Sequence, residues 1–177
     1  MYEQHPIEEE GELREESGTS IDFGITRGCE NWWHALASDN SEMNWCLMKF
    51  EKTSKGQQQN FPIWMLSHYL QGSQGMAELN EAMVTNTSLC LYGGFRVEAV
   101  DERDSVTSSR CKIIFFSFFG DAVATKVKSN SGMYVGQITS MCQGSHVRMH
   151  SDGEKFQQEN VIHALLQSSG SHKPTNW

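Results

Sequence analysis

The chain has 177 residues, of which 38% are hydrophobic and 20% are charged. This composition suits one packed domain, and no apolar run approaches the roughly 20 residues that membrane insertion needs. The formal net charge of −8 lies mostly in residues 3–16, which hold seven Glu and one Arg, so the other 15 acids and 13 bases nearly cancel. A near-neutral domain lacks the clustered basic face that nucleic-acid binding requires.

Residues 1–20 form an acidic segment with few apolar groups, which predicts a disordered tail and not a secretory signal. The five cysteines are widely spaced, and most lie beside apolar residues. An odd number in this setting predicts reduced, partly buried thiols in a cytoplasmic protein.

The first half of the chain predicts a helix, two strands and a second helix, separated by polar or glycine-rich breaks. Pro62 makes the start of the second strand an edge or loop position. These elements cover residues 21–37, 43–50, 61–70 and 76–84.

The second half begins with a strand over residues 88–98, where Gly93 and Gly94 predict a bulge or a close approach. A charged, hairpin-like connection then leads into a phenylalanine-rich strand, followed by a helix, an edge strand and a final helix. A capping-box pattern at Ser151–Glu154 predicts the start of that last helix. The connection, phenylalanine-rich strand, helix and edge strand cover residues 101–110, 111–119, 132–143 and 146–150.

The phenylalanine-rich strand carries four Phe and two Ile and no Pro. Such a run is typical of a strand buried on both faces, in the interior of a sheet. Strand alternation sends Phe115 and Phe119 to one face, and Phe116 and Phe118 to the other.

Burying every apolar side of these elements predicts an α+β fold, with a central mixed sheet of five to six strands flanked by helices on both faces. We expect a single domain over residues 21–167, followed by a flexible tail over residues 168–177.

Five local patterns, in order and with similar gaps, resemble the actin-depolymerising-factor homology (ADF-H) family, in particular its coactosin and drebrin-like branch. They cover most of the expected domain. The patterns are Ser41-Glu-Met-Asn-Trp45, Gly72-Ser-Gln-Gly75, Tyr92-Gly-Gly-Phe-Arg-Val97, Ser108-Ser-Arg-Cys-Lys112 and Phe118-Phe-Gly-Asp-Ala-Val123.

The resemblance implies a gelsolin-like fold and non-catalytic binding of actin, along filaments more than to monomers, by a monomeric cytoskeletal protein. Carried over to this sequence, the family's basic contacts fall on Arg110, Lys112, Lys126 and Lys128. We expect these cations to form one patch beside the helix that starts at Gly132. Relatives place Lys or Arg on that helix, whereas residues 132–143 contain neither.

Other interpretations stay open for these residues. Lys126 and Lys128 could simply solvate a turn, and Arg110 and Lys112 could guard a hydrophobic strand against aggregation. The domain could also be a scaffold that has lost actin binding, or it could bind monomeric actin or the actin-nucleating complex.

The sequence favours neither an enzyme nor a metal or cofactor site. It has no nucleophile elbow or Cys-His signature, and Gly72–Gly75 lacks the lysine of a phosphate-binding loop. His146 and His150 share a strand face but lie roughly 13 Å apart, too far for one ion.

Overall fold

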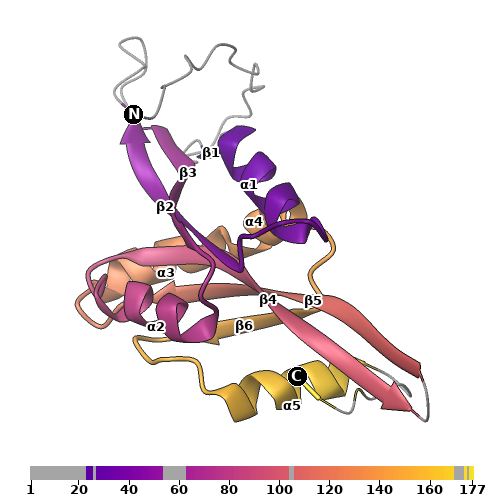
Figure 1. Cartoon of the computed structure of the whole chain (residues 1–177). Helices are drawn as coiled ribbons and strands as arrows, with labels where there is room; N and C mark the ends of the chain where they lie inside the picture. The colour runs from indigo at the N-terminus through magenta and orange to yellow at the C-terminus, as the bar shows by residue number, and fades with distance from the viewer. Residues whose placement is uncertain (1–22, 26, 54–62, 104–105, 170–173, 175) are drawn as a thin grey trace.

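The computed structural model describes residues 23–25, 27–53, 63–103, 106–169, 174 and 176–177 (Figure 1). The acidic tail and Pro62 therefore lie outside the described residues. Within them, six strands form one sheet in the order β1-β3-β2-β4-β5-β6. The strands are β1 (Phe23–Ile25), β2 (Trp45–Thr53), β3 (Ile63–Gly72), β4 (Cys90–Arg103), β5 (Val106–Phe119) and β6 (Val147–Ser151).

The β1–β3 and β5–β6 pairs are parallel, and the other neighbouring strands are antiparallel, so the sheet is mixed as predicted. The helices cover both of its faces (Figure 1). One face carries α1 (Arg27–Ala37), α3 (Thr125–Met133) and α4 (Val135–Met141), and the other carries α2 (Met76–Val84) and α5 (Gln158–Ser168).

Each face of the sheet has its own apolar cluster. Phe115 and Phe119 pack with Trp33 of α1 on the face that we call the α1 face. Phe116 and Phe118 pack with residues of α2 and α5 on the opposite face, the α5 face. The predicted alternation along β5 is confirmed, and so is the edge position of β6.

The close approach predicted at the paired glycines is confirmed at Gly94. A Cβ atom there would lie 2.4 Å from Trp33 Cζ3 and 2.8 Å from Leu36 Cδ2. Glycine therefore lets α1 pack directly onto the backbone of β4, which fixes the helix against the sheet.

Several predicted boundaries are wrong. The first helix begins at Arg27, because Ile25 belongs to β1. The segment 101–110 is not a connection, since β4 and β5 continue pairing as far as Arg103 and Val106.

The capping box at Ser151–Glu154 is also wrong. Ser151 ends β6, and its hydroxyl donates to the carbonyl of Glu154 within a turn. Gly153 has a φ of 83°, a left-handed conformation that interrupts a helix, and α5 begins only at Gln158.

The tail expected to be flexible contains residues that contact the sheet. Asn176 forms an antiparallel bridge with Val100 of β4, and Trp177 packs against the apolar cluster of the α5 face.

Candidate functional site

Arg110 and Lys112 lie on β5, opposite Ala99 and Val97 of β4. They alternate in phase with Ile114 and the other residues of β5 that face α5. Arg110 is exposed and Lys112 half-buried. The strand thus presents these two cations together on the α5 face, near the outer end of the long β4–β5 ribbon (Figure 1).

Lys126 and Lys128 lie in the first turns of α3, which begins at Thr125. The helix predicted over residues 132–143 is therefore wrong in its bounds. The structure has two helices there, and the first of them contains these two lysines. The polar sequence of α3 hides this helix, because Ser131 is its only buried residue.

The N-terminus of α3 has a positive potential that no capping or acidic side chain of its first turn offsets. Its N-cap residue, Ala124, makes no side-chain hydrogen bond to the helix, and the first turn contains no acidic residue. Exposed backbone N–H groups and the helix dipole add positive potential to that of the lysines. This end of α3 suits contact with a negatively charged surface.

The two lysines of α3 differ in their surroundings. Lys128 Nζ lies 2.5 Å from Asp152 Oδ1, in the turn after β6, and its hydrogen bond lowers the pKa of Asp152. Lys126 is exposed and makes no ion pair with any residue that the structure describes. Lys126 is thus the α3 cation available to a partner.

Two large apolar side chains of α3 face solvent. Val127 is 50% exposed and Met133 is 69% exposed. The sequence reasoning missed both, although an apolar residue between two lysines at a helix start is a visible signal. Val127, next to Lys126, and Met133, at the other end of α3, supply apolar contact area on the helix that carries the lysines.

The structure does not bring the four cations together into the single patch that we expected. Lys112 and Phe119, the last residue of β5, are seven positions apart, or about 23 Å of extended strand. The α3 lysines follow Phe119 on the α1 face, whereas Arg110 and Lys112 face α5. The molecule therefore has two separate cationic surfaces, which we call the α3 surface and the ribbon surface.

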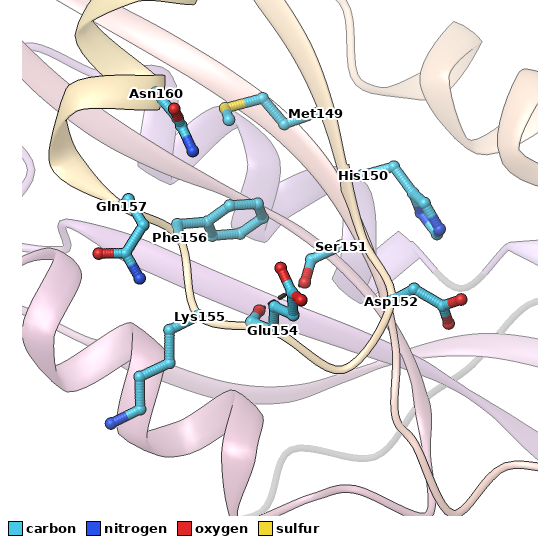
Figure 2. Close-up of a pocket in the computed structure, with 9 residues that line it drawn as sticks. All are labelled: Met149, His150, Ser151, Asp152, Glu154, Lys155, Phe156, Gln157 and Asn160. Atoms are coloured by element: carbon cyan, nitrogen blue, oxygen red, sulfur yellow. Dashed lines mark hydrogen bonds between the residues drawn. The ribbon is translucent and has the colours of Figure 1, made fainter.

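The remaining polar side chains that the structure describes form no further candidate site. Among the described residues no group of His, Cys, Asp or Glu could hold a metal ion. A pocket of about 470 Å³ lies between β6 and the start of α5 (Figure 2). In this view His150 and Asp152 point to one side and Lys155 to another, away from Phe156 at the centre.

The cysteines of the described residues are free thiols. Cys29, Cys46 and Cys142 are buried in the cluster of the α1 face. Burial raises the pKa of Cys46 to about 12, so it stays a neutral, unreactive thiol.

The described part of the chain holds no helix with the length and apolar character that crossing a membrane requires.

Residues 22–165 match the family of cofilin/tropomyosin-type actin-binding proteins, and the chain belongs to this family. The match spans the sheet and nearly all of the helices. Membership confirms the resemblance that the sequence motifs indicate.

Coactosin from Dictyostelium discoideum is 28% identical over 146 residues, which cover 80% of this chain and 90% of that protein. The crystal structure of coactosin from Entamoeba histolytica has the same fold, with a TM-score of 0.63 at 14% identity, over 85% of this chain and 98% of that one. Mouse coactosin, an actin filament binding protein, superposes with a TM-score of 0.58 at 15% identity, over 85% and 94% of the two chains. The fold is thus that of coactosins.

Proposed function

We propose that this chain binds the sides of actin filaments without catalysis and regulates the cytoskeleton as a stoichiometric partner. The observation that carries the proposal is the solvent-facing start of α3, in a chain of the actin-binding family. There, Lys126 is unpaired among the described residues and Val127 exposes apolar area, and Met133 exposes more at the other end of the same helix.

The α3 surface combines the two features that a specific contact needs. Its apolar side chains provide area to exclude water, and its charge orients a partner and speeds association. Actin's surface is acidic, so a positively charged helix start fits it.

The ribbon surface is a second contact in this proposal. Arg110 and Lys112 lie about 23 Å or more along β5 from Phe119, after which the chain leads into α3, and they face the α5 side of the sheet. A partner that meets both surfaces must be extended around the molecule. The side of a filament offers such a surface, which supports filament binding over binding to a monomer.

The test is co-sedimentation with actin filaments at low and physiological salt. Two variants, Lys126→Ala and the pair Arg110→Ala with Lys112→Ala, remove charge from one surface each. Exposed charge pairs contribute about 0.2–1 kcal/mol, so each lost charge should raise the Kd about 1.4- to 5-fold. The differences should shrink as salt rises.

The matched control is Lys155→Ala, which removes one charge from an exposed lysine outside both surfaces. It should pellet like the parent chain. If the parent chain does not pellet at tens of micromolar actin, filament binding is refuted, and the scaffold or monomer-binding alternatives take its place. If the control variant weakens binding as much as Lys126→Ala, the α3 surface is not the contact.

A further inference from the structure

Met133 has the largest exposed fraction of the large apolar side chains that the structure describes. It is 69% exposed, compared with 50% for Val127 and 37% for Leu70. The other methionines of the described residues are all buried or half-buried: Met43, Met48, Met65, Met76, Met83, Met141 and Met149. Of these thioethers, that of Met133 is therefore the most accessible to a dissolved reagent.

Met133 lies on the same side of α3 as Lys126. The two residues are seven positions apart in the helix, which is close to two turns. They therefore lie within about 20° of each other around the helix axis and about 10.5 Å apart along it. Ser131, the buried residue of this helix, is about 200° around the axis from Met133. A partner that binds along the Lys126 side of α3 contacts both side chains.

The packing of the domain does not depend on Met133. It belongs to neither apolar cluster of the sheet, whereas Met76 and Met149 pack against the cluster of the α5 face and Met141 packs against that of the α1 face. A chemical change at this exposed side chain should leave the free energy of unfolding nearly unchanged. It alters the surface of α3 instead.

We infer that Met133 is a site of reversible oxidation by hydroperoxides, and that its sulfoxide weakens the binding of a partner to the α3 surface. The thioether sulfur attacks the O–O bond of the hydroperoxide, takes one oxygen atom and gives up two electrons to the bond that breaks. The products are the sulfoxide and an alcohol, or water when the oxidant is hydrogen peroxide. A methionine sulfoxide reductase reverses the change, as two thiols become a disulfide and the oxygen leaves as water.

Oxidation weakens binding because it makes an apolar contact polar. The sulfoxide oxygen is hydrated in the free chain, so contact with a partner must remove that water, and burial of the side chain gains less free energy. This consequence rests on the proposed function, since it needs a partner that binds α3. A loss equal to the burial of one or two methylene groups raises the Kd about 4- to 15-fold.

The first test maps oxidation in the full chain and does not involve actin. Hydrogen peroxide is added, and peptide mass spectrometry follows the sulfoxide at each methionine over time. In the native chain Met133 should oxidise several-fold faster than the other described methionines, whereas in urea all of them should react at similar rates. Native oxidation of Met76 or Met149 as fast as Met133, or the same order of rates in urea, overturns the site.

The second test measures co-sedimentation with actin filaments before and after peroxide treatment, with catalase added to remove peroxide before mixing. The parent chain should lose about 4- to 15-fold in affinity, and a methionine sulfoxide reductase should restore it. Met133→Leu keeps an apolar side chain without sulfur, so its Kd should not change on treatment. Met76→Leu, in α2, is the matched control and should lose affinity as the parent chain does.

The outcomes separate this inference from the proposed function. If the untreated parent chain does not pellet, the proposed function fails, while the oxidation map still decides whether Met133 is the site. If oxidised Met133 leaves the Kd unchanged, or if Met133→Leu loses affinity on treatment as the parent does, the regulatory role is wrong. Thermal unfolding followed by circular dichroism should give the same Tm before and after limited oxidation, and a lower Tm would show that the change acts through the fold and not through the surface.

Discussion

Replacing Gly94 with alanine tests how tightly α1 is seated on the sheet. The added Cβ would lie 2.4 Å from one Trp33 ring atom and 2.8 Å from a Leu36 methyl, both below any normal contact. Neither neighbour moves away easily. Trp33 is 1% exposed and its indole N–H donates to the carbonyl of Gln143 at 2.8 Å, while Leu36 is fully buried.

Overpacking of a rigid core costs about 1–3 kcal/mol, and two immobile neighbours place Gly94→Ala near the upper end of that range. The lower backbone entropy of unfolded alanine returns about 0.4–1 kcal/mol. We therefore expect a net loss of about 2 kcal/mol of unfolding free energy. For a chain of this length, the Tm should fall by about 4–8 °C.

The matched control is Gly136→Ala in α4, where a new Cβ meets nothing within 4 Å. Alanine is the better helix former there, so this variant should gain up to about 1 kcal/mol. Urea unfolding followed by circular dichroism measures both variants. If Gly94→Ala keeps the stability of the parent chain within about 0.5 kcal/mol, α1 does not rest on β4 as described.

Three further predictions concern the α3 surface and the thiols. Tyr92→Phe removes the hydroxyl that donates to the carbonyl of Ser131 at 2.8 Å; this carbonyl keeps the N–H of Tyr134 as a donor, so urea unfolding should show a loss of about 0.5–1.5 kcal/mol, the net value of one hydrogen bond. Asp152→Asn removes the charge that pairs with Lys128, so filament binding should tighten at low salt and return to the parental value at high salt in co-sedimentation. Cys46 should react with a thiol reagent at pH 8 only after unfolding, because burial raises its pKa to about 12; fast reaction in the native state, followed by mass spectrometry, would contradict its burial.

The sheet was the most predictable part of the fold. The run of apolar residues along β5 is stable only as a strand buried on both faces, in the interior of a sheet. The paired glycines of β4 predict a close approach, which the structure confirms at Gly94. The polar helix α3 was not predictable in the same way. Its helical state depends on tertiary contacts, such as the hydrogen bond from Tyr92 to Ser131, which have no local pattern.

The spatial arrangement of the candidate cations could not be predicted from the sequence, for a different reason. Their positions follow from the family motifs, but their arrangement depends on the length and pleat of β5, which carry Lys112 and the α3 lysines to different ends and faces. The bridge between Asn176 and Val100 was also not predictable from the sequence, because a single bridge between residues 76 positions apart leaves no periodic signal.

The unequal roles of Lys126 and Lys128 follow from the same misjudged element. In an extended segment, residues two apart share a face, and both lysines would serve a partner equally. In a helix, two residues are separated by about 200° around the axis, so only one of them can point toward the turn after β6. That residue is Lys128, which Asp152 holds, and the helix thereby leaves Lys126 to face the solvent and any acidic partner.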